Sequence, residues 1–177
     1  ALPTLAKQGP QHWHRLYRNR GALSFEDVTS SSGILQEGYG MGATTGDIDG
    51  DRKPDLVVLG LGFIHVYRNL GGGRFEIRKL PNQGHWAYAA ALEDFDGDGD
   101  RDLFVVNYAG WNPKTDPPCK VNQLPDYCHP RYYPPRPNQL FENDGRGNFR
   151  DVSDSSGLAK HLGKGMGLAV ADFNADG

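Results

Sequence analysis

Two acidic stretches of the chain carry carboxylates at alternate positions, with glycines between them. Residues 94–102 read Asp-Phe-Asp-Gly-Asp-Gly-Asp-Arg-Asp, and residues 47–55 read Asp-Ile-Asp-Gly-Asp-Arg-Lys-Pro-Asp. Such a run of like charges repels itself unless a cation lies among them. Calcium takes about 6–8 oxygen ligands from a flexible loop, and glycine lets the backbone curl around the ion. The spacing therefore predicts a calcium site in each stretch.

A third copy of the spacing begins at residue 172, with Asp172, Asn174 and Asp176. A single acidic turn is often only a solvated loop, but recurrence of one spacing along a chain favours metal binding. The loops are not EF-hands, because the twelfth position holds Val58 in the first loop and Val105 in the second instead of a glutamate. The aspartate at the ninth position must then close each site.

Short apolar runs follow the first two loops, at residues 56–59 and 103–106, and both are rich in β-branched or aromatic side chains. Runs of this length and composition predict buried strands. Three further segments, at residues 16–29, 66–76 and 140–153, share an asparagine followed six residues later by phenylalanine. Each predicts a hairpin that turns at a glycine.

Loops and hairpins alternate along the chain, and the first two loops begin 47 residues apart, at Asp47 and Asp94. A period near 50 residues with four short strands per unit is typical of propeller blades. We therefore predict an all-β fold made of β-propeller blades of four antiparallel strands, two complete and two partial, as a single partial propeller domain. Its predicted parts are the end of one blade (1–35), a blade (36–85), a blade (86–160) with an insertion (109–137), and the start of the next blade (161–177).

The expected strands of the first complete blade are residues 40–45, 56–61, 64–69 and 75–80. Those of the second are 88–92, 103–107, 139–143 and 149–152, and residues 165–170 are expected to form the first strand of the next blade. The insertion holds eight prolines and both cysteines, Cys119 and Cys128, so it cannot be a regular helix or strand. We predict an ordered loop closed by a disulfide, with a floppy linker as the alternative.

These motifs resemble the FG-GAP/VCBS repeat proteins, which are calcium-stapled β-propellers, often with seven blades. Residues 138–145, which follow the insertion, are more similar to the ASPIC/UnbV-type members related to cartilage acidic protein. The resemblance covers residues 16–177. It implies Ca²⁺ as the cofactor, with side-chain ligands except where a carbonyl is stated: Asp47, Asp49, Asp51, Lys53 (carbonyl), Asp55, Asp94, Asp96, Asp98, Asp100 (carbonyl) and Asp102, and in the third loop Asp172, Asn174 and Asp176.

Two complete repeats are fewer than the roughly 4–8 blades that close a propeller. We therefore expect further blades, from the same or a neighbouring chain, to complete both terminal blades. A net charge of −3 with scattered basic residues gives no nucleic-acid footprint. No apolar run approaches the ~20 residues of a membrane span. The predicted calcium loops and two nearby cysteines favour an extracellular, cell-surface or periplasmic location.

Motifs of known catalytic chemistry are missing from the sequence. The histidines lack zinc spacing, and there is no nucleophile elbow or phosphate-binding loop. We therefore expect a non-catalytic extracellular or cell-surface propeller for adhesion, assembly or scaffolding, with a protein or glycan partner at the cell surface. A glycan-binding propeller is the alternative, because Trp86, Tyr108 and Trp111 near the second loop could stack on sugar rings or simply pack. A polysaccharide-acting enzyme is a third reading that the sequence leaves open.

Overall fold

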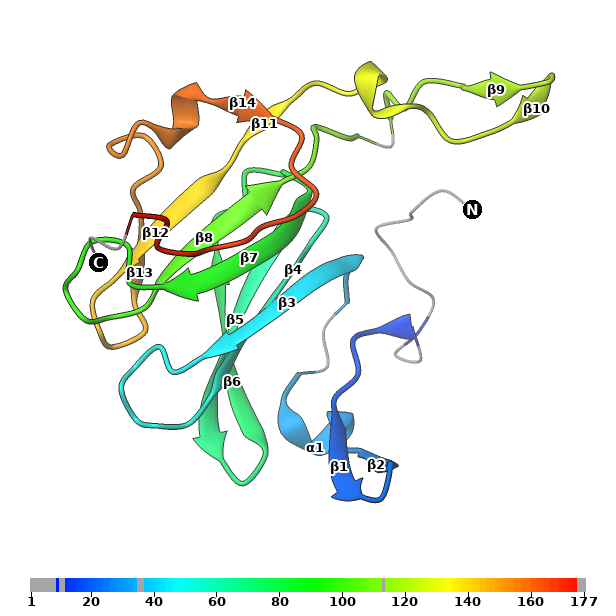
Figure 1. Cartoon of the computed structure of the whole chain (residues 1–177). Coiled ribbons are helices and arrows are strands. Elements are labelled where there is room, and N and C mark those ends of the chain that lie inside the picture. The colour runs from blue at the N-terminus through cyan, green and yellow to red at the C-terminus, as the bar shows by residue number, and fades with distance from the viewer. Residues whose placement is uncertain (1–8, 10–11, 35–36, 113, 175–177) are drawn as a thin grey trace.

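The computed structural model describes residues 9, 12–34, 37–112 and 114–174. It contains two four-stranded antiparallel sheets that pack against each other (Figure 1). The first sheet has the order β3-β4-β5-β6, and the second has the order β13-β12-β8-β7. Their strands are β3 (Gly40–Gly46), β4 (Asp55–Gly60), β5 (Phe63–Gly71), β6 (Arg74–Leu80), β7 (Ala87–Glu93), β8 (Asp102–Asn107), β12 (Gln139–Asn143) and β13 (Phe149–Asp151).

The prediction of all-β structure in four-stranded antiparallel sheets is confirmed, and the strand boundaries lie close to those expected. Side chains alternate along β4 as the strand period requires. Val57 and Leu59 face the second sheet, whereas Val58 packs on the opposite face with Tyr67. The first sheet is therefore buried on both sides.

The main core lies between the two sheets and joins the repeats into one body. Burying ten apolar side chains in one cluster removes them from water, which is the dominant stabilising term in folding. Ile48, from the first acidic loop, is part of this cluster. The other members are Val57, Leu59, Ile64, Val66, Ala87, Leu92, Leu103, Val105 and Phe141.

The N-terminal segment covers the other face of the first sheet. It contains a hairpin of β1 (Tyr17–Gly21) and β2 (Ser24–Asp27), followed by one helical turn, α1 (Thr29–Ser32). Ile34 is buried against Val58 and Tyr67. The predicted hairpin is therefore present, and the segment packs on the first sheet through Leu16 before the hairpin and Ile34 after it.

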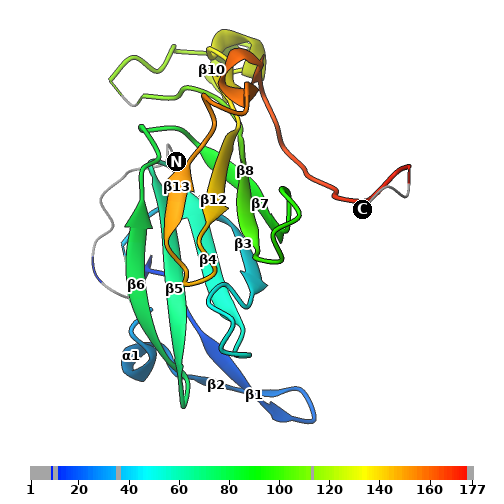
Figure 2. The ribbon, with the colours of Figure 1, turned by 90° about the vertical axis from the view of Figure 1, so that its left-hand side faces the viewer.

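The insertion between β8 and β12 leaves the body of the protein as a projecting arm at one end of the sheets (Figures 1 and 2). It holds a hairpin of two short strands, β9 (Lys120–Val121) and β10 (Leu124–Pro125), and a short 3-10 turn, η2 (Pro130–Tyr132). Its last residues, β11 (Arg136–Pro137), pair with β14 (Leu162–Gly163), which follows the turn η3 (Leu158–Lys160). The insertion is thus ordered but mostly irregular, as its prolines require.

The predicted strand at residues 165–170 is wrong, since the structure gives these residues no regular secondary structure. A strand exists only where a neighbour completes its hydrogen-bond ladder. The segment lies beside the end of β8, where the Gly165 amide donates to the Asn107 carbonyl at 3.2 Å, and no partner strand flanks it within the described residues. In the part of the chain that the structure describes, no helix has the length and apolar character to cross a membrane.

Candidate functional site

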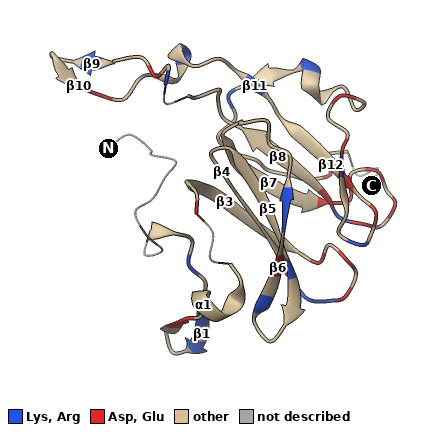
Figure 3. Ribbon diagram, turned by 180° about the vertical axis from the view of Figure 1, so that it is seen from behind, with Lys and Arg blue, Asp and Glu red and all other residues tan. Residues whose placement is uncertain are grey.

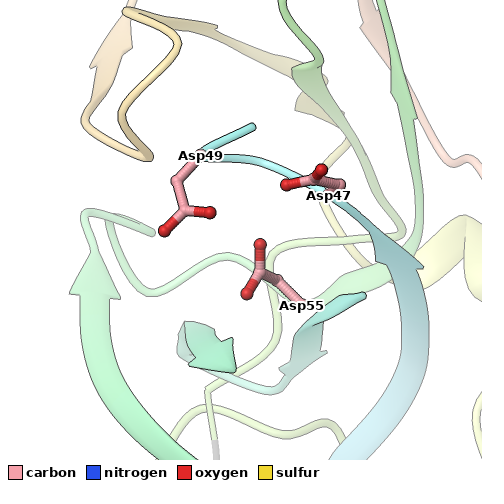
Figure 4. A group of neighbouring side chains, drawn as sticks. All are labelled: Asp47, Asp49 and Asp55. Atoms are coloured by element: carbon pink, nitrogen blue, oxygen red, sulfur yellow. The ribbon is translucent and has the colours of Figure 1, made fainter. Parts of the chain in front are cut away.

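Each acidic loop connects the first two strands of its sheet and brings three carboxylates together. Oxygens of Asp47, Asp49 and Asp55 all lie within 4.8 Å of one another. Figure 4 shows the three side chains pointing toward one shared space. In the second loop the equivalent group is Asp94, Asp96 and Asp102, under the same 4.8 Å limit. The first, third and ninth positions of each loop therefore converge.

Side-chain hydrogen bonds to the backbone fold the first loop into this shape. The Asp47 carboxylate accepts the Arg52 amide at 2.7 Å. Asp49 accepts the Asp51 amide at 3.3 Å, and Asp51 accepts the Lys53 amide at 2.9 Å. Aspartate favours such local turns because its short side chain reaches the backbone two residues ahead.

The second loop repeats this network at equivalent positions. Asp94 accepts the Gly99 amide at 2.9 Å, five residues ahead, as Asp47 does in the first loop. Asp96 accepts the Asp98 amide at 3.2 Å, and Asp98 accepts the Asp100 amide at 2.9 Å. One acidic spacing therefore produces the same loop twice.

Asp55, at the ninth position, is buried and ties the loop to the third strand of its sheet. Its two carboxylate oxygens accept the amides of Ile48 at 2.9 Å and Asn69 at 2.6 Å. Burial raises the pKa of Asp55, although these two hydrogen bonds oppose the rise. Since each oxygen has more than one lone pair, the same carboxylate can also face a cation.

Asp102 plays the same part in the second repeat, where it too is buried. It accepts the Phe95 amide at 3.1 Å and the Asn143 amide at 2.9 Å. In both repeats the ninth aspartate therefore stabilises the loop by accepting two backbone amides, and this role does not depend on a metal.

Two asparagines that the sequence marked only as hairpin residues belong to this site. The Asn69 side chain donates to the Pro54 carbonyl at 2.9 Å, and that of Asn143 donates to the Arg101 carbonyl at 3.0 Å. Asn143 also donates to the carbonyl of Ile48 at 2.8 Å, so it links the β12–β13 hairpin of the second sheet to the first loop. The regular occurrence of asparagine in each hairpin was the signal that could have revealed this role.

The carboxylate groups fit a hard divalent cation. Asp47 Oδ1 is buried and has no hydrogen-bond donor among the described residues, which leaves an acceptor that a cation would satisfy. Desolvation raises the pKa of Asp96, and the charges of Asp98, Asp102 and Asp94 add to the rise. Oxygen ligands of this kind suit calcium.

The remaining predicted ligands lie outside these groups of three. Asp51 forms an ion pair with Lys53, whose Nζ lies 2.5 Å from Asp51 Oδ2, and hydrogen bonds from Lys53 hold the pKa of Asp51 below its ordinary value. Asp98 bonds to backbone within its loop. The ligand roles of these two residues, and of the Lys53 and Asp100 carbonyls, stay predictions.

The third loop is described only at its start. Asp172 and Asn174 are exposed, and the Asn174 amide donates to the Asp172 carboxylate at 3.2 Å. Asp176 lies outside the described residues. The predicted third site therefore stays a prediction.

The cysteines Cys119 and Cys128 and the aromatic residues Trp86, Tyr108 and Trp111 lie at the end of the sheets opposite to the acidic loops, whose aspartates are red in Figure 3. Cys119 and Cys128 form a disulfide within the arm. The Trp86 ring centroid lies 5.5 Å from that of Tyr108 and 5.9 Å from that of Trp111. These rings pack on one another and also line a hollow of about 780 Å³ beneath the arm.

Four-stranded antiparallel sheets, each with an acidic loop between its first two strands, define a repeat protein with candidate cation sites. A family model of the FG-GAP-like repeat matches residues 8–58 and again residues 47–105. Because the two matches together cover more than half of the chain, it belongs to the FG-GAP-like repeat family. The second match contains both acidic loops.

A short stretch of the chain is also similar to curated proteins. Cartilage acidic protein 1 of Xenopus tropicalis is 49% identical over 41 residues, which are 23% of this chain and 6% of that protein. Cartilage acidic protein 1 of Mus musculus has the same identity and coverage. The match therefore spans only a small part of either relative.

Proposed function

We propose that this chain is part of a non-catalytic, calcium-stabilised β-propeller that serves adhesion, assembly or scaffolding outside the cell. The observation that carries the proposal is the carboxylate group of three, which recurs with the same hydrogen bonds in both repeats. FG-GAP repeats are extracellular adhesion-type repeats. The position of each loop, at the start of a buried strand, favours a structural ion over a catalytic one.

Asp47, Asp49 and Asp55 would hold the ion of the first loop, and Asp94, Asp96 and Asp102 that of the second. A bound calcium ion supplies positive charge that offsets the repulsion within each group. The chain itself pre-shapes the loop through its aspartate–amide bonds, so binding requires little rearrangement. Each site would then fix the connection between the first two strands of a blade.

Further blades, as in the FG-GAP/VCBS and ASPIC/UnbV-type proteins, are part of the proposal. Two features support them: the two sheets already pack face to face through one core, and an apolar side chain at the second loop, Phe95, is left partly exposed. Phe95 at the second loop is 40% exposed, whereas Ile48 at the same position of the first loop is 2% exposed and covered by the second sheet. A further blade, from this or a neighbouring chain, would cover Phe95 in the same way.

The proposed location is extracellular, cell-surface or periplasmic. FG-GAP repeats are typical of extracellular proteins, and the disulfide of the arm fits an oxidising compartment. The glycan-binding alternative gains support from one observation, since Trp86, Tyr108 and Trp111 line the same hollow.

Calorimetry with and without calcium tests the main proposal. We expect excess chelator to lower the melting temperature, because a ligand that binds only the folded state stabilises it by mass action. Added calcium should restore the original value, and Asp49→Asn combined with Asp96→Asn should abolish the response. Identical melting curves in calcium and in chelator would refute calcium stabilisation.

A further inference from the structure

The hollow beneath the arm has the size and chemistry of a ligand site. Its volume of about 780 Å³ lies within the roughly 300–1,000 Å³ of typical small-molecule sites. Its floor lies where the two sheets end and is formed by the rings of Tyr39, Trp86 and Tyr108. The insertion supplies the opposite wall.

Hydrogen bonds hold the inner rings in fixed positions. Asp116 Oδ1 accepts both the Trp111 indole N–H, at 3.0 Å, and the Tyr133 hydroxyl, also at 3.0 Å. Burial, together with Asp116, raises the pKa of Tyr133 to about 12, so its hydroxyl stays a donor at neutral pH. One carboxylate thus orients two aromatic side chains before a ligand arrives. This lowers the entropic cost of binding, because these rings need not be ordered by the ligand.

The outer wall is also pre-shaped. The Cys119–Cys128 disulfide closes the hairpin at its base, where the Asp126 amide donates to the Cys119 carbonyl at 3.0 Å. Beside it, Tyr127 is 74% exposed and lies on the lining of the hollow. An aromatic ring presented to solvent on a cross-linked loop is available for stacking without a change of fold.

Polar groups of both signs complete the lining. Asp116 and Asp126 supply carboxylate acceptors, and Lys120 supplies an ammonium donor. Within the described residues, neither carboxylate forms an ion pair with a lysine or arginine. An uncharged ligand rich in hydroxyl groups can use both acceptors and the donor, whereas an organic cation would leave the Lys120 donor unused.

We propose that this hollow is a carbohydrate-binding site. A pyranose ring would place its apolar face on the aromatic rings and its hydroxyl groups against Asp116, Asp126 and Lys120. The inference deepens the glycan alternative of the proposed function and rests on it for the extracellular source of the ligand. It does not depend on the acidic loops, which lie at the opposite end of the sheets.

Soluble oligosaccharides test the site directly. Trisaccharides of glucose, mannose, galactose and N-acetylglucosamine are titrated into the protein up to about 10 mM, with tryptophan fluorescence and calorimetry as readouts. Trp86 and Trp111 line the hollow, so we expect saturable quenching by at least one sugar, with Kd below about 1 mM. No saturable signal from any of the four sugars would overturn the proposal.

Three variants locate the binding. Tyr127→Ala, Asp116→Asn and Trp111→Ala are each expected to weaken it at least tenfold. The matched control is Tyr132→Ala, because Tyr132 is 54% exposed on the same insertion but is not part of the lining. Wild-type affinity in all three variants would show that the hollow is not the site, and Tyr127→Ala keeps the test informative if the buried Trp111→Ala variant does not fold.

Two further titrations fix the ligand class and separate the proposals. Tetramethylammonium that binds in the hollow where no sugar does would overturn the carbohydrate assignment. Sugar binding is also measured in excess chelator under conditions where the protein remains folded. An unchanged melting curve in chelator refutes the calcium proposal, whereas absent sugar binding refutes only the carbohydrate site.

Discussion

The two acidic loops share one hydrogen-bond network but differ in the charge that surrounds it. Residues 47–55 contain four acids and two bases, whereas residues 94–102 contain five acids and one base. In the first loop the Arg68 Nε lies 2.5 Å from the Asp49 carboxylate. Aligning Asn69 with Asn143 places Glu142 at the position of Arg68, and Glu142 pairs with Arg150 at 2.6 Å instead of bringing a cation to the second loop.

This difference shows that the shape of each loop and its charge balance depend on different residues. Because the aspartate–amide bonds recur in both loops, the backbone shape follows from the spacing of the aspartates. Charge balance follows from residues outside that spacing: Arg68 pairs with Asp49 of the first loop, whereas no lysine or arginine of the described residues pairs with an aspartate of the second. We therefore expect the first loop to keep its shape better without calcium, and the second to depend on the ion more strongly.

Loss of the ninth aspartate should have the largest effect and should be similar in both repeats. Asp55→Ala and Asp102→Ala each leave two backbone amides without their acceptor in a buried place. Each unsatisfied group costs about 1–3 kcal/mol, so the loss of two acceptor contacts should lower the free energy of unfolding by about 2–6 kcal/mol. Urea unfolding in the presence of chelator measures this structural part alone. A loss below about 0.5 kcal/mol in either variant would break the equivalence of the repeats.

The pH dependence of stability should differ between equivalent positions of β5 and β12. His65 occupies the place of Gln139 when the repeats are aligned on Asn69 and Asn143. Burial lowers the pKa of His65 to about 4, and the charges of Lys79 and His14 add to the shift. The unfolded chain takes up this proton near pH 6.5, the folded protein only near pH 4. Stability from neutral His65 is therefore complete above pH 6.5 and falls toward pH 4.

The total loss from His65 should be on the order of 2–3 kcal/mol at pH 4. Urea unfolding at several pH values checks it, with His65→Gln as the matched variant because glutamine does not titrate. The difference in unfolding free energy between the two proteins should be constant above pH 6.5 and shrink below it. Parallel profiles between pH 7 and pH 4 would show that His65 does not titrate with folding.

Removing the basic partner of the first loop should make it more like the second. Arg68→Gln deletes the cation beside Asp49, and we expect calcium to bind the first loop more tightly by about 1 kcal/mol, roughly fivefold. The matched control, Glu142→Gln, should weaken binding at the second loop by a similar or smaller factor. Calorimetric titration measures both, with the other loop disabled by Asp96→Asn or Asp49→Asn. Tighter binding in the control would contradict the charge comparison.

The smallest expected effect concerns the sixth position of each loop. Arg52 has a φ of 65°, whereas Gly99 at the equivalent position has a φ of 94°. The left-handed region costs a residue with a Cβ about 1–2 kcal/mol, and glycine loses part of that gain through its greater freedom in the unfolded chain. Arg52→Gly should therefore raise the free energy of unfolding by about 0.5–1 kcal/mol, and Gly99→Arg should lower it. Thermal unfolding of both variants checks the sign.

Local features of the structure were predictable because they depend on neighbouring residues. The aspartate spacing of residues 47–55 and 94–102 predicted two similar loops, and the apolar runs after them predicted β4 and β8. The hairpins at Asn69 and Asn143 were equally clear. The strand expected at residues 165–170 was wrong, because a strand depends on a partner and the segment's own composition cannot supply one.

The sequence by itself therefore determined the repeat, its strands and the acids that converge in each loop, since all of these act over a few residues. Only the tertiary structure decided that Asn143 binds the carbonyl of Ile48 in the other repeat and that Arg68 neutralises Asp49. It also decided that Trp111 from the insertion meets Trp86 beneath the disulfide-closed arm. Contacts between residues distant in the chain arise from the packing of two sheets and an arm, and no local pattern encodes them.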